Sequence, residues 1–264
     1  MNTQFEKEEE TAKKAAIEAG KLLIENLNQV KNVSFKEEGL YKEYAQEVSN
    51  MDIRAGEKIR FLLKQDFTDH NFLIEDFEPE DKQSDFTWII DPIDGTTQYL
   101  RALPYFAISI ALKFKSEVVL GVVFIPALNE MFIAQKGNGA YLNGKRIKVS
   151  EETDIEKILV GISAYPSFKV TNNEDKLLKL LRSIDHIRMF GTPVIDLCNV
   201  AAGRLDARIK SPTKPWDHSA ACCIIEEAGG KVTDWKGDPW TPDSDSILAT
   251  NGKTHDEILK ILSD

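Results

Sequence analysis

Cysteine and histidine are scarce in this sequence, and their scarcity excludes two common ways of holding a fold together. The 264 residues include three cysteines and four histidines. Cys198, Cys222 and Cys223 are too few and too unevenly spaced for a disulfide framework or a zinc site. We therefore expect them to be small buried hydrophobic residues with free thiols, in a reducing compartment.

Basic side chains and long apolar runs are also in short supply. Lysine and arginine number 33 against 43 acidic residues, so the formal net charge is -10. A surface of that sign disfavours binding to nucleic acid or to anionic membranes. The most apolar segments, 106–114 and 118–125, are far shorter than the roughly 20 residues of a membrane helix. The polar, acidic first residues are unlike a secretory signal, so we expect a cytoplasmic protein with neither nucleic acid nor membrane as partner.

The hydrophobic pattern that is present divides the chain into two halves. In residues 1–149, apolar residues at helical spacing predict helices over 5–28 and about 48–65. A largely antiparallel sheet should follow, with an Asn143-Gly144 hairpin turn. Its predicted strands cover 72–74, 87–90, 105–114, 117–125 and 130–134.

Helices and strands alternate in residues 150–264, which favours an α/β subdomain behind an α+β first half. Thr254 and Glu257 have the spacing of a capping box at the start of the last helix. No linker separates the halves, so they should share an interface, where ligand sites are common. The predicted helices cover 172–184, 193–203, 218–228 and the end of the chain from Thr254, and the strands 186–190, 206–209, 231–235 and 246–250.

The stretch Trp88–Thr97, WIIDPIDGTT, places two carboxylates at the end of an apolar strand. Asp91 follows the strand directly, Pro92 should end it, and the residues from Asp94 can begin a short helix with free backbone N–H groups. Such groups attract anions, and carboxylates beside them would repel an anion unless divalent cations lie between. A plain Asp-Pro/Asp-Gly turn remains the alternative interpretation.

Other acids strengthen the metal hypothesis. Glu75 and Asp76 end the strand before Asp91 in the same manner, and Asp217 precedes a predicted helix, where a simple helix cap is the alternative. Carboxylate oxygens with few histidines suit Mg²⁺, or Mn²⁺, better than Zn²⁺. Together these acids predict a two-metal cluster, an arrangement that catalyses phosphoryl transfer.

Two long segments, DPIDGTTQYLRALPYFAISIAL (91–112) and WDHSAACCIIEEAGG (216–230), resemble the signature motifs of the inositol monophosphatase family. These are Mg²⁺-dependent, lithium-sensitive phosphatases. The resemblance extends over the chain through GAYLNGKRI (139–147) and GTPVIDLCNVAAGRLDA (191–207). It implies the layered αβαβα sugar-phosphatase fold, hydrolysis of a small phosphorylated polyol or sugar, and a homodimer.

The resemblance also implies a ligand for each metal. Glu75, Asp91 and the backbone carbonyl of Ile93 would hold the first ion. Asp91, Asp94 and Asp217 would hold the second, with Asp91 bridging, and a third, weaker ion is expected near Glu75.

Phosphate and the attacking water have their own implied partners. Asp94 and Asp217 count among the substrate-facing acids, and the N–H groups of Gly95 and Thr96 would bind the phosphate. Either Glu75, or the Thr96 hydroxyl paired with Asp52, would orient and deprotonate the water. Without the resemblance, Asp52 would be interpreted as a solvated helix charge.

Substrate choice is where the sequence departs from the family. Gly191 and Thr192 fit substrate-facing backbone positions, but Lys210 stands where inositol-preferring members usually have a glutamate. A lysine only donates and adds positive charge, and Arg208 and Lys214 stand nearby in the sequence, so this basic segment could favour a substrate with a second anionic group. A Lys210 that points into solvent is the alternative. Gln98 replaces the family's usual asparagine, which we interpret as a conservative change.

Two alternatives to an inositol-1-monophosphatase-like enzyme follow. One is a bisphosphate-specific member, acting on fructose 1,6-bisphosphate or a 3′(2′),5′-bisphosphate nucleotide. The other belongs to a different class, a regulatory partner of the RNA-synthesis machinery, although the sequence shows no basic patch to support it.

Overall fold

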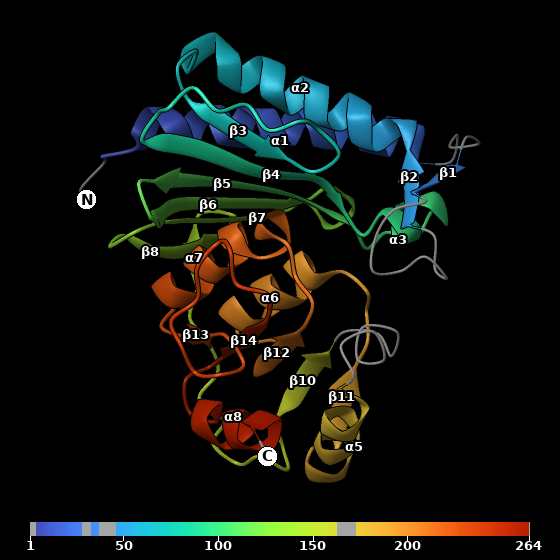
Figure 1. The fold of residues 1–264 in the computed structure, drawn as a ribbon, viewed down its shortest axis with the longest axis vertical. Coiled ribbons are helices and arrows are strands. Elements are labelled where there is room, and N and C mark those ends of the chain that lie inside the picture. The colour runs from blue at the N-terminus through green and yellow to red at the C-terminus, as the bar shows by residue number, and fades with distance from the viewer. Residues whose placement is uncertain (1–3, 28–32, 37–45, 163–172, 264) are drawn as a thin grey trace.

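Helical and sheet layers alternate through the molecule, five in all (Figure 1). The computed structural model describes residues 4–27, 33–36, 46–162 and 173–263, with the backbone path alone for 33–36 and 46–49. Two helices cover a seven-stranded sheet, two more lie between it and a five-stranded sheet, and a last pair covers the far side. The predicted α/β class and αβαβα layering are therefore confirmed.

The outer layer consists of α1 (Glu6–Asn26) and α2 (Asn50–Asp66), close to their predicted bounds. Fully buried alanines, among them Ala12, Ala16 and Ala19, line the inner face of α1. Small side chains let this helix approach both α2 and strand β6 closely. A two-stranded antiparallel pair not expected from the sequence, β1 (Val33–Lys36) and β2 (Gln46–Ser49), precedes α2.

The first sheet runs from β3 to β9 in sequence order. Every neighbouring pair is antiparallel except β3 and β4, which are parallel. Asn143 and Gly144 both have positive φ, which confirms the predicted hairpin turn. The strands are β3 (Asn71–Ile74), β4 (Phe86–Asp94), β5 (Ala107–Phe114), β6 (Glu117–Ile125), β7 (Glu130–Gln135), β8 (Gly139–Leu142) and β9 (Lys145–Arg146).

The middle layer, α6 (Pro193–Ala201) and α7 (Ser219–Glu227), belongs to the second half of the chain but packs on the sheet of the first. One core cluster joins Ile89 and Ala111 of that sheet to both helices. The division at residues 149 and 150 thus falls between the two sheets, while the hydrophobic core spans both halves. The three cysteines lie in this core as free buried thiols, as predicted.

The second sheet has the order β11-β10-β12-β14-β13 and mixes parallel with antiparallel pairs. Its strand β10 was not predicted, because a four-residue apolar run gives little periodicity. Helices α5 (Glu174–Ser183) and α8 (His255–Ser263) cover its outer face. The strands are β10 (Leu159–Ile162), β11 (His186–Arg188), β12 (Ala207–Lys210), β13 (Lys231–Thr233) and β14 (Ile247–Thr250).

The capping box predicted for α8 is wrong. The Thr254 hydroxyl is buried and has no hydrogen-bond partner among the described residues. Asn251 supplies the local acceptor instead, because its Oδ1 accepts from the N–H groups of Lys253 and Thr254. Across the described ranges, no helix combines the length and the apolarity that crossing a membrane requires.

Candidate active site

Two parallel strands bring Glu75 and Asp91 to one edge of the first sheet. Ile74 of β3 lies opposite Ile90 of β4, and the Glu75 N–H donates to the Ile90 carbonyl at 3.0 Å. Because residues that follow paired positions on parallel strands lie side by side, Glu75, the first residue after β3, is a neighbour of Asp91 within β4. The juxtaposition expected from the two strand ends is therefore present.

A β-bulge sets the direction of Asp91 and Asp94. Asp91 pairs with Ser109 and Asp94 with Ala107, so β4 uses three steps where β5 uses two. In a regular strand, residues three apart face opposite sides, and the extra residue of a bulge restores them to one side. The prediction that Pro92 ends the strand is wrong. The strand continues to Asp94, with Pro92 inside the bulge, where proline disrupts no regular ladder.

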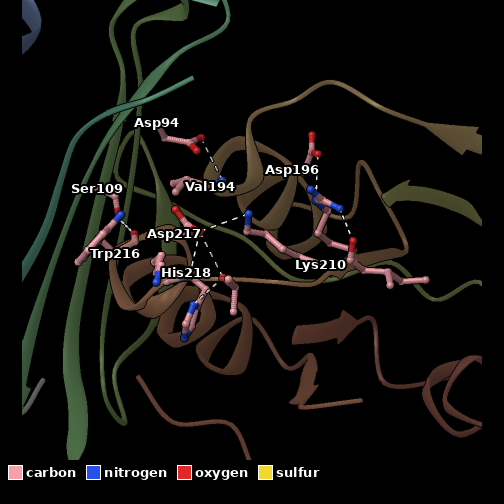
Figure 2. Close-up of polar contacts among 12 residues, drawn as sticks. Asp94, Ser109, Val194, Asp196, Lys210, Trp216, Asp217 and His218 are labelled. Carbon is pink, nitrogen blue, oxygen red and sulfur yellow. Dashed lines mark hydrogen bonds and ion pairs between the residues drawn. The ribbon is translucent and has the colours of Figure 1, made fainter. Parts of the chain in front are cut away.

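These acids repel one another in a buried environment. Asp91 is 2% exposed, and burial, followed by the charges of Glu75, Asp94 and Asp217, raises its pKa well above the usual range. Burial and the charge of Asp217 likewise raise the pKa of Asp94. Asp94 also crosses between the halves, since its Oδ2 accepts the N–H of Val194 in α6 at 3.1 Å (Figure 2).

Thr96 and Asp52 form the hydrogen bond that the resemblance implied. The Thr96 hydroxyl lies 3.1 Å from Asp52 Oδ1 and 3.2 Å from the carbonyl of Ile93, and its one hydrogen serves both acceptors. Asp52, in the first turn of α2, is 3% exposed and is therefore not a solvated helix charge. The pair reaches the metal motif from a separate helix, and its catalytic role stays a prediction.

The turn that follows Asp94 requires glycine. Gly95 has φ +93°, and a Cβ there would lie 2.5 Å from Thr192 Cγ2 and 3.0 Å from the Tyr105 carbonyl. It precedes the short helix α3 (Thr96–Leu100), whose first bond runs from the Tyr99 N–H to the Gly95 carbonyl. The N–H groups of residues 95–98 consequently have no partner within the helix, as phosphate binding would require.

Gln98 closes this turn against the second half of the chain. Its Nε2 donates to the carbonyl of Phe190 at 2.9 Å, and a Cβ on Gly191 would lie 2.4 Å from the same nitrogen. Gly191 and Thr192 thus lie directly beside the Gly95 turn, where substrate-facing residues were expected. Interpreting Gln98 as a conservative change missed this contact, because its partner is 92 residues away in sequence.

Among the described residues, the contacts to the Asp217 carboxylate all fall on its Oδ2. Asp217 ends the 3₁₀ turn η2 (Pro215–Asp217), and its Oδ2 accepts the Lys214 N–H at 3.0 Å. Lys210 Nζ lies 3.2 Å from that same oxygen (Figure 2). The cap considered for Asp217 therefore belongs to a different element. Asp217 caps η2, and His218 is the residue that precedes α7. Lys210, 17% exposed, points at this acid rather than into solvent.

His218 fixes the segment that carries Asp217. Its Nε2 lies 3.2 Å from the carbonyl of Thr241 and its Nδ1 lies 3.1 Å from the Thr213 hydroxyl. The carbonyl can only accept, so Nε2 carries the proton and Nδ1 accepts from Thr213. Burial lowers the pKa of His218 and keeps the ring neutral. Only its position next to Asp217 in sequence could have signalled this role.

A buried ion pair lies behind the turn formed by Gly191 and Thr192. Arg208 Nε is 3.1 Å from Asp196 Oδ2, and Arg208 is 1% exposed (Figure 2). The Tyr105 hydroxyl donates to Asp196 Oδ1 at 3.4 Å. Burial raises the pKa of Asp196 to about 6, even though the charge of Arg208 lowers it. Arg208, which the sequence placed in a basic segment near the substrate, is therefore paired with a carboxylate of the protein itself.

A family model supplies the decisive comparison. The model described as the inositol monophosphatase family matches residues 5–264. The chain belongs to the inositol monophosphatase family.

Relatives and solved structures agree. A fructose-1,6-bisphosphatase/inositol-1-monophosphatase of Thermotoga maritima is 36% identical over 219 residues, which cover 82% of each chain. Nus factor SuhB of Pseudomonas aeruginosa is 34% identical over 94% of this chain and 93% of its own. The solved suhB protein of Bartonella henselae superposes with a TM-score of 0.89 at 31% identity, covering 97% of this chain and 98% of that one. The chain is accordingly a phosphoric monoester hydrolase.

Members of the inositol monophosphatase family are generally metal-dependent, and the donors here fit a hard divalent cation in chemistry. They are all carboxylate or carbonyl oxygens, and a cation would relieve the repulsion that raises the pKa of Asp91. Among the described residues, no three acidic, histidine or cysteine side chains yet converge to enclose an ion. The ligand roles of Glu75, Asp91, Ile93, Asp94 and Asp217 stay predictions.

Proposed function

We propose that the protein is a Mg²⁺-dependent phosphomonoesterase for a small phosphorylated polyol or sugar, with inositol 1-phosphate as the reference substrate. The observation that carries this proposal is the bulge in β4. It turns Asp91 and Asp94 to one side of the strand, next to the Gly95 turn, whose first helix N–H groups have no partner within the helix. The carboxylates proposed to bind metal are therefore next to the backbone amides proposed to bind phosphate.

The protein's own groups have separate tasks in this proposal. Bound Mg²⁺, or Mn²⁺, supplies an activated water and neutralises phosphate charge. The N–H groups of Gly95 and Thr96 hold the phosphate oxygens and align the ester for direct in-line attack. The attacking water gives its proton to the Thr96 hydroxyl, which passes its own proton to Asp52, as the bond from the water oxygen to phosphorus forms. The ester P–O bond breaks on the opposite side, and a water held by Asp217 protonates the departing alkoxide. Glu75 is the alternative general base.

A bisphosphate is the second candidate substrate. Lys210 adds a positive charge where a polyol-binding acid would accept hydrogen bonds, and relatives such as the T. maritima protein carry fructose-1,6-bisphosphatase in their names. Adenosine 3′,5′-bisphosphate has the same second anionic group. Replacing Lys210 by methionine should lower the enzyme's activity on such a bisphosphate more than its activity on inositol 1-phosphate.

Phosphate release tests both candidates. The panel is inositol 1-phosphate, fructose 1,6-bisphosphate, adenosine 3′,5′-bisphosphate and histidinol phosphate, each assayed with Mg²⁺ and with EDTA. Asp91→Asn should abolish release, whereas Asp243→Asn, a matched change at an exposed acid, should leave it intact. Substantial Mg²⁺-dependent release by the Asp91 variant would contradict the assignment, as would a folded wild type that releases nothing.

Further parts of the proposal concern assembly and cellular role. We propose a cytoplasmic homodimer, consistent with the exposed side chains of Met189 and Phe190 beside the site, and light scattering would measure its mass. A regulatory role in RNA synthesis rests on the names of the SuhB relatives alone. A catalytically silent Asp91→Asn variant that still complements loss of the gene would favour that role.

A further inference from the structure

The side chain of Lys210 is engaged by a predicted metal ligand. Lys210 Nζ lies 3.2 Å from Asp217 Oδ2, and each side chain is 17% exposed (Figure 2). The pair therefore lies between the surface and the core, where water screens it less than a fully exposed ion pair. The Lys214 N–H at 3.0 Å and the Thr213 hydroxyl at 3.5 Å contact the same oxygen, so Oδ2 carries all three contacts.

The strand geometry explains how a lysine enters a group of acids. Ala207 and Ile209 of β12 belong to the core cluster beneath the second sheet. Strand side chains alternate, so Arg208 and Lys210 face the opposite way, towards the middle layer. Arg208 is bound by Asp196, which leaves Lys210 as the cation of this strand that meets Asp217. The positive charge of Lys210 also lowers the pKa of Asp94, whereas the negative charge of Asp217 raises it.

A divalent cation and Lys210 compete for the same carboxylate. An ion bound between Asp94 and Asp217 would lie within a few ångströms of the ammonium group, and two cations at that separation repel each other strongly. The backbone of Lys210 is fixed by its pairing with Ile247, whereas its four-carbon side chain can swing away. The ion can therefore displace the ammonium without disturbing the strand.

We propose that Lys210 is a built-in counter-ion of Asp217, which metal binding displaces and thereby presents to an anionic group of the substrate. This inference rests on the proposed function, because it assumes a divalent cation at Asp217 and an anionic substrate. It gives Lys210 two alternating partners. Metal binding and anion binding become coupled, and each strengthens the other by the same factor.

Calorimetric titration with Mg²⁺ in the absence of substrate tests whether the metal competes with Lys210 for Asp217. Lys210→Met should bind Mg²⁺ about tenfold more tightly at the site that includes Asp217, because the ion no longer has to displace a positive charge there. Lys214→Met is the matched control, since it removes a charge four residues away but keeps the backbone N–H that holds Asp217. Its affinity should change less than twofold. Unchanged or weaker Mg²⁺ binding by Lys210→Met would overturn the proposal.

Amine labelling of the wild-type protein tests the displacement directly and needs no variant. A small acylating reagent, read out by peptide mass spectrometry, should modify Lys210 several-fold faster with Mg²⁺ than with EDTA. Lys214 should react equally in both, because its side chain is already exposed. A Lys210 rate that stays constant or falls with Mg²⁺ would overturn the proposal. Neither measurement requires turnover, so an inactive substrate panel would contradict the proposed function while leaving this result to be judged separately.

Discussion

Gln98 and Phe190 join the two halves of the site through one hydrogen bond, from the side-chain Nε2 of the first to the backbone carbonyl of the second at 2.9 Å. Gln98 belongs to α3, directly after the proposed phosphate turn, and Phe190 precedes Gly191 and Thr192. The bond therefore ties the proposed phosphate-binding turn to the two residues predicted to face the substrate.

Removing this bond should impair substrate positioning more than stability. Gln98→Ala is expected to lower kcat/KM about threefold to tenfold, since a neutral hydrogen bond contributes roughly 0.5–1.5 kcal/mol. Gln98→Glu keeps the length but lacks the donor, so it should behave like the alanine variant. Steady-state kinetics with the best substrate of the panel would measure both. If Gln98→Glu retained wild-type kinetics, the hydrogen bond would not be the source of the effect.

The buried Arg208–Asp196 pair should make a large contribution that depends on both partners. Arg208→Met leaves Asp196 buried without its counter-charge, which we expect to cost about 3–5 kcal/mol in the free energy of unfolding. The pKa of Asp196, already raised to about 6, would rise further. A raised carboxyl pKa means that the folded state binds more protons than the unfolded state, so stability falls as pH increases. The defect should therefore be smaller at pH 5 than at pH 8.

Urea denaturation of the single variants and of Arg208→Met/Asp196→Asn would test this expectation. The double variant should be more stable than Arg208→Met alone, because it no longer buries an unpaired charge. Simple additivity of the two losses would show that the pair does not act as a unit.

The juxtaposition of the predicted metal ligands Glu75 and Asp91 was predictable because their positions follow from local sequence. Each comes directly after an apolar run, and parallel pairing of β3 with β4 is enough to bring them together. The bulge at Pro92 was not predictable, because a proline after a strand usually ends it. The strand's continuation depends on pairing with β5, which the local residues do not specify.

The partners of the basic residues depended on tertiary contacts. The sequence left Lys210 with a substrate anion or solvent as alternatives and named Arg208 as a basic neighbour, yet each pairs with an acid of the protein. Their common direction could have been found from the alternation along a short strand, since residues two apart share a face. The packing of α6 and η2 decides which acids lie on that face, and the sequence pattern does not indicate this packing.

Gly121 allows α7 to lie close against the first sheet. A Cβ at this position would lie 2.3 Å from the carbonyl oxygen of Ala220, a backbone atom of α7. Gly121→Ala should therefore push the helix outward, cost roughly 1–3 kcal/mol of stability, and lower kcat by displacing the neighbouring Asp217. Gly144→Ala is the control. It has open space and a positive φ, so it should cost about 1 kcal/mol and leave kcat unchanged. Equal loss of kcat in both variants would contradict the role of α7.

Asp91 should limit the stability of the metal-free protein. Its pKa is raised by burial and by the charges of Glu75, Asp94 and Asp217, so the folded state holds a proton that the unfolded state releases. Stability should then fall as pH rises from the unfolded pKa of about 4 towards the raised folded value, by about 1.4 kcal/mol for each unit of the shift. In EDTA at pH 7.5, Asp91→Asn should melt a few degrees above the wild type although it is inactive. Mg²⁺ should raise the melting temperature of the wild type and not that of the variant. A variant that melts below the wild type in EDTA would show that this carboxylate is already compensated without metal.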